Sequence, residues 1–505
     1  MSDNSMYEKT MYDNSMYEKT MYDNSMNDKS MSSTSLSKAY IAVNHFGYGA
    51  RGDELVQAKV NPKQWIISQL LPITFDSSLP HSNDIFIEHA NYRKQKKQQK
   101  QQKQQKKRGQ QSPNRQLSKN AMPEDRMSEN KMSKNGMLNN YARQTLRSMS
   151  VDTLSQAIHS SHSVSWRLLD FFSNHFSVSA QGQLMVGLSA TLEREAIAPN
   201  LLGKFEDLLL AVEQHPAMLI YLNNEKSFGL NSRIAKKRKV GLNENLAREI
   251  MELHTLGVDG GYNQADVIEL AKGISGWSVK KPVKERSAGF IFRPHGHEPG
   301  SRTLLGKKYS QQGMAQGQQM LRDLAMNPAT VKYVCFKLAH HFVSESPPVS
   351  LLNKMEATWM KTSGNLKKVM VSLFSADEAW SASTQKFKTP REFIISTNRA
   401  IALKKIKPKA LFNSLVSLGQ QPFNAGSPAG FSDDETDWLG ASALMARIDW
   451  STRLSGYLKR LNAEKVMTVA LGDSVSQHTY QSVMRAESRQ QAMTLLLMSP
   501  EFQRR

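Results

Sequence analysis

The segment from Asn243 to Trp277, NENLAREIMELHTLGVDGGYNQADVIELAKGISGW, constrains the fold more than any other part of the chain. Apolar residues recur three and four positions apart in its first half, as they do on one face of an amphipathic helix. Asn243 is a favourable N-cap for this helix, and Gly257 is a favourable stop. Asn263, with Asp266 three positions later, opens a second helix. The segment therefore predicts two capped helices around a glycine-rich turn.

Polar residues of the first predicted helix can form one site only if they share a face. Glu252 lies about 60° from Glu249 around an α-helix, whereas His254 lies about 140° from Glu249. One metal ion cannot easily take ligands from both sides of a helix, so we expect His254 to be a buried histidine with a satisfied hydrogen bond. Arg248 and Glu249 are the residues of this segment that we expect to face a pocket.

Most of the remaining chain also shows helical periodicity. Apolar residues recur three and four positions apart in residues 166–176 and 201–222, with Gly and Pro only at the breaks. Thr389, Pro390 and Glu392 form the start of a helix, with the side chain of Glu392 reaching back to complete a capping box. These patterns predict a mainly α fold.

One region departs from the helical pattern. Residues 279–309 are rich in Gly, Pro and basic residues, and Phe290 and Phe292 alternate within them. This composition predicts an extended loop or a short hairpin. We therefore expect a large multi-helix domain over residues 37–500, with two helical lobes joined by this extended or hairpin region.

Two tracts are of low complexity. Methionine recurs every five residues through residues 1–36, and again within residues 93–140. A period of five matches neither a helix nor a strand, so we expect a disordered tail over residues 1–36 and a disordered insertion over residues 93–140. A methionine comb that binds a soft metal ion is the alternative interpretation.

The insertion also carries much of the positive charge. Residues 93–119 contain eleven Lys or Arg residues and no carboxylate, about half of the net charge of +21. Such a Lys/Gln-rich arm is usually solvated, but it can also bind nucleic acid or an anionic surface through counterion release. Few aromatic residues lie among these basic residues, so stacking on single-stranded bases is not supported.

Several common classes of protein are disfavoured by the sequence. It contains no HExxH, GxxxxGK, GxSxG or GxGxxG motif, and its one cysteine excludes a disulfide framework. That residue, Cys335, falls on an apolar helical face of VKYVCFKLAHHF, so we expect a packed thiol. No run of eighteen apolar residues and no signal-peptide core are present, so we expect a soluble, cytoplasmic protein without a transmembrane segment.

Eight motifs follow one another over most of the chain: HFGYGA from His45, NHFSVSA from Asn174, EREAIAP from Glu193, HPAMLIYL from His215, the Asn243–Trp277 segment, HEPGSRTLLG from His297, SPAGFSDD from Ser427 and SPEFQRR from Ser499. In these motifs and in their order, the chain resembles the domain of unknown function 1800 family, a group of uncharacterised bacterial proteins.

The resemblance implies a helical fold but no reaction. The family usually has Trp where Phe172 stands and Asp where Glu298 stands, so the geometry of any site that uses the shorter carboxylate is altered here. Members of the family commonly carry an export signal and are encoded beside exported sulfatase-like proteins. The resemblance therefore leaves export open and implies a sulfatase-like partner.

These observations support two hypotheses of function from different classes. The first is a binding or assembly protein that acts with a partner, because the common catalytic motifs are missing. The alternative is a hydrolase-like enzyme whose polar side chains meet in a pocket between helices, with these candidates taken from the family-like motifs: His175, Glu195, Arg248, Glu249 and His297. His297 also alternates with His295, but no third metal ligand follows, so we expect no metal site and identify no cofactor.

Overall fold

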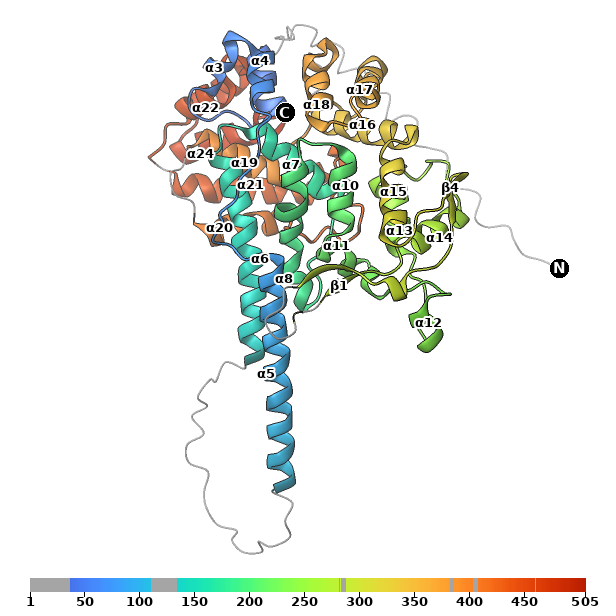
Figure 1. The fold of residues 1–505 in the computed structure, drawn as a ribbon. Coiled ribbons are helices and arrows are strands. Elements are labelled where there is room, and N and C mark those ends of the chain that lie inside the picture. The colour runs from blue at the N-terminus through green and yellow to red at the C-terminus, as the bar shows by residue number, and fades with distance from the viewer. Residues whose placement is uncertain are drawn as a thin grey trace, which may run out of the picture. The chain divides into compact units, whose positions relative to one another are not determined.

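The computed structural model describes residues 37–109, 134–280, 282, 288–381, 386–402, 407–458 and 460–505. These residues fold mainly into helices, with four short strands among them, which confirms the predicted fold class (Figure 1). The tail expected to be disordered, residues 1–36, lies outside the described residues. Residues 37–505 form one compact unit.

The first part of this unit places one helix at its centre. The predicted helix over 166–176 is α7, and ten of its thirteen residues are buried, so neighbouring helices surround it. The elements up to the signature segment are α2 (Lys38–Tyr40), η1 (Ile41–Phe46), α3 (Glu54–Val60), α4 (Pro62–Ser68), α5 (Ser82–Gly109), α6 (Lys134–His159), α7 (Ser163–His175), α8 (Gln183–Leu192), η2 (Glu193–Ile197), α9 (Ala198–Asn200), α10 (Phe205–Glu213), α11 (Pro216–Tyr221), η3 (Asn224–Lys226) and α12 (Arg233–Lys237).

Helices α5 and α6 correct the expectation for residues 93–140. Residues up to Gly109 continue α5, and residues from Lys134 onward belong to α6, while 110–133 lie outside the described residues. Lys, Arg and Gln are good helix formers, and the buried Ile85 and Phe86 anchor the first turns of α5, so the helix continues through the basic run. The later turns of α5 extend past the helices that cover its start (Figure 1).

The signature segment forms the predicted helix pair with one difference. Its first helix is α13 (Asn245–Glu249), which continues as the π-helix η4 (Ile250–His254), so the expectation of one regular α-helix is wrong. Asn243 lies one residue before the assigned cap, and its side chain accepts a hydrogen bond from Asn245 N. The second helix, α14 (Gln264–Gly273), has the predicted start, with a complete Asn263–Asp266 capping box.

The region from 279 to 309 contains two antiparallel hairpins. Strand β1 (Trp277–Lys280) pairs with β2 (Gly289–Phe292), and β3 (Arg302–Leu304) pairs with β4 (Lys307–Tyr309), with η5 (Pro294–Gly296) between the hairpins. Trp277 pairs with Phe292 at one end of the first hairpin. The hairpin part of the prediction is therefore confirmed.

The remaining elements complete the helical body. They are α15 (Met314–Ala325), α16 (Pro328–Phe342), α17 (Val349–Lys361), α18 (Leu366–Ser375), η6 (Asp377–Trp380), α19 (Pro390–Ala400), α20 (Pro408–Ser417), η7 (Glu435–Trp438), α21 (Ala441–Tyr457), α22 (Ala463–Leu471), η8 (Gly472–Ser474), α23 (Gln477–Met484), α24 (Arg489–Met498) and α25 (Pro500–Gln503). The Thr389–Glu392 capping box predicted for α19 is present, and Cys335 is buried on α16 as expected.

The two ends of the described unit meet. The hydroxyl of Tyr40 on α2 donates to the carbonyl oxygen of Glu501 at 2.8 Å, across 461 positions of sequence. Arg505, four residues after Glu501, exchanges two backbone hydrogen bonds with Lys386, of 2.9 and 2.8 Å. Among the described helices, none is both long and apolar enough to cross a membrane.

Candidate functional site

A cavity of about 140 Å³ lies where α7, α16 and the start of α19 meet the loop that precedes η7. Its apolar lining consists of Phe171, Pro422, Phe423 and Phe431. Its polar lining consists of Tyr48, Asp170, Ser173, Asn174, His175, Ser177, Glu193, Lys337, His340, His341, Thr389, Arg391, Glu392, Gln420, Ser432 and Asp433. A cavity with both kinds of lining is suited to a small organic ligand.

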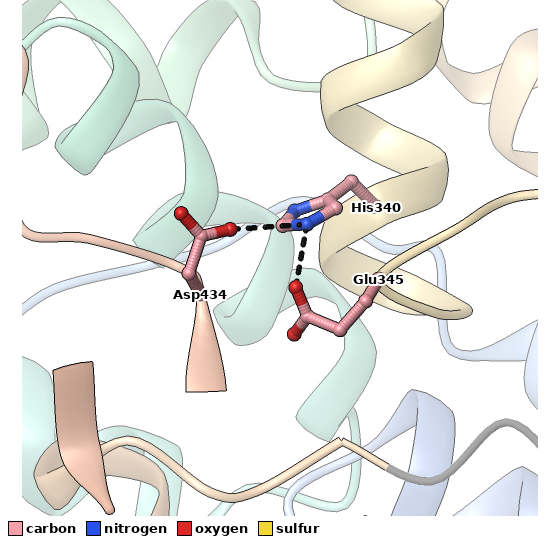
Figure 2. Close-up of side chains that lie close together, drawn as sticks. All are labelled: His340, Glu345 and Asp434. Atoms are coloured by element: carbon pink, nitrogen blue, oxygen red, sulfur yellow. Dashed lines mark hydrogen bonds and ion pairs between the residues drawn. The ribbon is translucent and has the colours of Figure 1, made fainter. Parts of the chain in front are cut away.

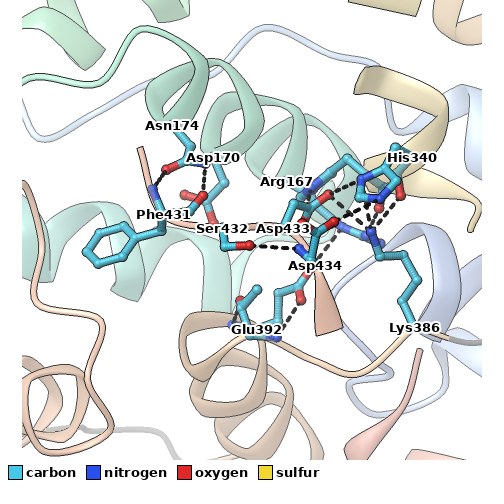
Figure 3. A network of polar contacts seen from close by, with 12 residues as sticks. Arg167, Asp170, Asn174, His340, Lys386, Glu392, Phe431, Ser432, Asp433 and Asp434 are labelled. Atoms are coloured by element: carbon cyan, nitrogen blue, oxygen red, sulfur yellow. Dashed lines mark hydrogen bonds and ion pairs between the residues drawn. The ribbon is translucent and has the colours of Figure 1, made fainter. Parts of the chain in front are cut away.

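A matched set of buried charges forms one side of this cavity (Figure 3). Glu392 Oε1 lies 2.9 Å from Arg505 Nε and 3.3 Å from Arg167 Nε, and both arginines are almost fully buried. Burial alone would raise the pKa of Glu392, but the two arginines lower it to about 2. Arg167 also donates to the carbonyl oxygens of His45 and His341. Glu392 is therefore an ionised carboxylate at the centre of an interior ion-pair cluster.

Asp433 continues this cluster from the loop. Its carboxylate lies 3.1 Å from His341 Nδ1, 3.2 Å from Lys386 Nζ and 3.7 Å from Arg505 Nη2. Burial lowers the pKa of His341 to about 4, so its ring is neutral and donates from Nδ1 to the carboxylate. His341 Nε2 is then a bare, buried acceptor without a hydrogen-bond partner in the described part of the chain.

A second carboxylate of the cavity, Asp170, is held by two donors. The Tyr48 hydroxyl and Arg391 Nε both donate to Asp170 Oδ2, and Arg391 Nη2 lies 2.5 Å from Oδ1. Burial outweighs the charge of Arg391 and raises the pKa of Asp170 to about 6. This carboxyl group therefore titrates close to neutral pH.

Lys337 on α16 and His175 on α7 form a polar pair that contains no carboxylate. Lys337 Nζ lies 3.2 Å from His175 Nδ1, and His175 Nε2 lies 3.2 Å from the carbonyl oxygen of His254. Burial lowers the pKa of Lys337 to about 8, an effect that the charge of Asp433 only partly opposes. Among the described residues Lys337 has no ion-pair partner; its Nζ lies 5.4 Å from the centre of the Tyr333 ring, so its positive charge meets an aromatic face and a neutral histidine but no paired carboxylate.

His340, Glu345 and Asp434 bring three possible metal ligands together beside the cavity (Figure 2). His340 Nε2 lies 2.9 Å from Glu345 Oε2 and 3.3 Å from Asp434 Oδ1. However, Lys386 Nζ lies 3.2 Å from Glu345 Oε1 and 3.3 Å from His340 Nδ1. This ammonium group pairs with Glu345 and would repel a divalent cation, so ion pairing explains the cluster better than a metal centre does.

Asn174 fixes the loop that carries Asp433. Its side-chain amide donates to the carbonyl oxygen of Phe431 at 2.8 Å and accepts from Phe431 N at 2.8 Å (Figure 3). The preceding residue, Gly430, has a φ of +86°, and a Cβ there would lie 2.6 Å from Asn174 Oδ1. Glycine is therefore required at 430 for both the backbone conformation and the close approach.

Three π-helices of the described chain supply backbone or side chains to this region; η2 and η4 fall within family-like motifs, and η1 ends in the first two residues of another. Helix η1 provides the His45 carbonyl oxygen to Arg167, η2 provides Glu193 to the cavity wall, and η4 provides the His254 carbonyl oxygen to His175. Short π-helical turns are rare and often occur at functional sites. Their positions support the cavity as the centre of the molecule's function.

Of the five residues predicted from the sequence, His175 lines the cavity and the other four do not. Glu195 accepts hydrogen bonds of 2.6 Å from both the backbone and the hydroxyl of Ser82, and it lies 3.2 Å from His215 Nε2. His297 Nδ1 lies 3.0 Å from the carbonyl oxygen of Ser275, next to the hairpins. Glu195 and His297 are therefore hydrogen-bonded to groups that do not line the cavity.

Arg248 and Glu249 of α13, which we expected to face a pocket, do not line the cavity. Arg248 is 42 % exposed at its side chain, and it donates to Gln264 at 2.7 Å and lies 3.5 Å from Glu244. Glu249 is partly buried, and burial raises its pKa. His254 is the buried histidine that we expected, because its Nδ1 lies 2.8 Å from the fully buried Glu213.

Sequence reasoning missed most of the residues that line the cavity. Lys337, His340 and His341 occur in VKYVCFKLAHHF, which we interpreted only through the packing of Cys335. The available signal was a lysine followed by histidines three and four positions later, which places all three on one side of a helix. Asp433 lies in the quoted motif SPAGFSDD, but no pattern in the sequence indicated its partners.

The fold and the cavity together define a mainly helical protein with a polar interior site. The chain belongs to the family described as protein of unknown function (DUF1800), whose sequence profile matches residues 41–504. This confirms the resemblance inferred from the motifs. Neither the curated proteins nor the solved structures include a match to the chain.

Proposed function

We propose that the protein binds a small organic ligand in the cavity and that this ligand presents a carboxylate or another oxygen acceptor to Lys337. The observation that carries the proposal is the unmatched amine of Lys337 at the cavity wall. A partly buried ammonium group without a counter-charge is unfavourable, and an acceptor on a ligand removes part of that cost. Phe171 and Phe423 offer apolar surface to the rest of the ligand.

Thermal unfolding in the presence of benzoate tests this proposal, because benzoate joins a carboxylate to an apolar ring. At ten times its Kd, a ligand that binds only the folded state stabilises it by about 1.4 kcal/mol. We expect benzoate to raise the Tm of the full chain, and we expect the Lys337→Met variant to lose this shift.

Lys361→Met is the matched control, because Lys361 is an exposed lysine at the end of α17. Its benzoate shift should equal that of the unmodified chain. A shift of equal size in Lys337→Met, or no shift in the unmodified chain up to tens of millimolar benzoate, would contradict the proposal.

A second candidate function is acid–base catalysis in the same cavity, including hydrolysis. It is favoured by two groups whose pKa values lie near neutral pH, Asp170 at about 6 and Lys337 at about 8. Pairs of titratable groups with shifted pKa values are frequent at catalytic sites. Of the five residues predicted from the sequence, this candidate keeps only His175 and adds the other groups that line the cavity.

The partners remain separate proposals. The exposed basic residues of α5, which include Arg93, Lys94 and Lys97, support binding to nucleic acid or another anionic surface, because no carboxylate lies among them. A protein partner of the sulfatase-like kind rests only on the family resemblance. The ligand cavity is independent of both.

A further inference from the structure

The contacts around His175 fix which of its two ring nitrogens carries the proton. A carbonyl oxygen can only accept, so His175 Nε2, 3.2 Å from the His254 carbonyl oxygen, must be the donor. His175 Nδ1 is then an unprotonated acceptor for Lys337 Nζ at 3.2 Å. Burial and the nearby charge of Lys337 hold the pKa of His175 well below its ordinary value, so the ring stays neutral.

The ring of His175 is also fixed in orientation. It stacks on Phe171 with an interplanar angle of 11° and meets the edge of Phe176 at a centroid distance of 4.6 Å. The His254 carbonyl group that holds it belongs to η4, and the His254 side chain is itself bonded to the buried Glu213. The acceptor therefore points at Lys337 from a rigid support.

Lys337 differs from the other lysines whose pKa burial lowers. Lys388 has a pKa of about 7, but it is 3 % exposed and its Nζ donates to the carbonyl oxygen of Phe502 at 2.6 Å. Lys386 is also buried, and it is paired with Asp433 and Glu345. Of these three amines, Lys337 alone lines the cavity, where a small molecule can reach it.

We propose that Lys337 forms an imine with a small aldehyde or ketone held in this cavity. The inference rests on the proposed ligand-binding function and names the reactive group of the ligand. An amine held against a neutral imidazole, which a third group orients in turn, is the arrangement found at activated nucleophiles. The aromatic walls of the cavity favour a carbonyl compound with an apolar body.

The reaction needs no additional reagent. The free amine nitrogen attacks the carbonyl carbon, a C–N bond forms, and the C=O π electrons move to oxygen. A proton passes from nitrogen to that oxygen, and the hydroxyl group then leaves with a second nitrogen proton as water, which gives the C=N bond. A lysine with a pKa of about 8 has about one tenth of its amine free at pH 7, against less than one thousandth for an ordinary lysine.

Reductive trapping of the full chain tests this proposal. The protein is incubated with benzaldehyde and sodium cyanoborohydride at pH 7, and the benzylated lysines are located by peptide mass spectrometry. We expect Lys337 to be labelled at least tenfold faster than exposed lysines such as Lys361. We expect Lys337→Arg, which keeps the charge, to lose the fast label, and Lys361→Arg to retain it.

His175 acts on this reaction as a positioning residue. We expect His175→Phe to slow the labelling of Lys337 at every pH, and His175→Gln, which keeps a side-chain acceptor, to restore part of the rate. Equal labelling in the Phe variant would remove the role of His175. Circular dichroism of each variant checks that it is folded.

The test separates the imine from the wider proposal. If benzoate raises the Tm through Lys337 but benzaldehyde labels all lysines alike, the imine is excluded and ligand binding stands. If benzoate has no effect and Lys337 is not labelled preferentially, both proposals fail. Fast labelling that survives Lys337→Arg would also overturn the inference, because a different amine would then be the reactive one.

Discussion

Two sides of the same cavity differ in whether their buried charges have partners of opposite sign. Around Glu392 each charge has a partner of opposite sign within a few ångströms, namely Arg167 and Arg505. Around Lys337 the nearest polar partner is a neutral histidine ring. The first arrangement holds α7, α19 and the residues after α25 together, whereas the second leaves an amine without a carboxylate partner, which the proposed ligand would supply.

This difference predicts different consequences for removing a charge on each side of the cavity. Removing a member of a matched cluster exposes its partners to an apolar interior without compensation. Removing an unmatched group takes away a cost that the folded state already carries. Substitutions on the two sides should therefore change stability in opposite directions.

The largest effect is expected for Glu392→Gln. The change leaves Arg167 without an ion-pair partner and Arg505 with only the 3.7 Å contact to Asp433, and it also weakens the capping box of α19. We expect the free energy of unfolding to fall by about 3–5 kcal/mol at pH 7, measured by urea denaturation. Glu487→Gln, a change at an exposed glutamate, is the control and should leave the midpoint unchanged.

The pH dependence of this substitution has a definite sign. The pKa of Glu392 is lowered from 4.5 to about 2 in the folded state, so its stabilisation is complete above pH 4.5 and is lost as pH falls towards 2. The difference in stability between the unmodified chain and Glu392→Gln should therefore shrink over that interval. A constant difference would show that Glu392 does not act through its charge.

An intermediate effect of opposite sign is expected for Lys337→Met. The pKa of Lys337 is lowered from 10.5 to about 8, so the folded state is penalised below pH 8 and the penalty disappears as pH rises towards 10.5. We expect the variant to be more stable than the unmodified chain by about 1 kcal/mol at pH 7, with the gap closing by pH 10.5. Urea denaturation across this pH range measures the gap.

Lys361→Met, at the exposed end of α17, provides the comparison for Lys337→Met and should show no such pH-dependent gap. A loss of stability in Lys337→Met at pH 7 would mean that the amine is matched after all. The contrast between the two sides of the cavity would then disappear.

The smallest effect is expected for Arg248→Ala, outside both sides of the cavity. Arg248 is partly exposed and makes only an i,i+4 pair with Glu244 and a hydrogen bond to Gln264. We expect a loss of less than about 0.5 kcal/mol and an unchanged benzoate shift of the Tm. If the variant lost the benzoate shift, Arg248 of the signature segment would have to belong to the ligand site.

The sequence predicted the parts of the fold that depend on local patterns. The α19 capping box needs only Thr389 and Glu392, three positions apart, and the helices follow from apolar spacing. The π-helical turn at η4 could not be predicted in this way, because an α-helical spacing was assumed across residues 250–254. Such turns depend on tertiary packing more than on local propensity.

Most residues of the site could not be predicted from the sequence, for a related reason. Lys337 and His175 come from helices that are 162 positions apart, and nothing in either segment specifies the other. His175 was identified because a family-like motif contains it, and the same reasoning selected Glu195 and His297, which are bound elsewhere. Motif membership located the important helices but not the side chains that meet.

The hydrogen bond between Tyr40 and Glu501 has a consequence for how the molecule is made. It joins segments 461 positions apart, and Arg505 reaches from the same end of the chain into the cluster around Glu392. Contacts of such long range carry a large loop-closure entropy and form late during folding. The wall of the cavity is therefore completed only after Arg505 has been synthesised, and until then this polar interior stays open to water.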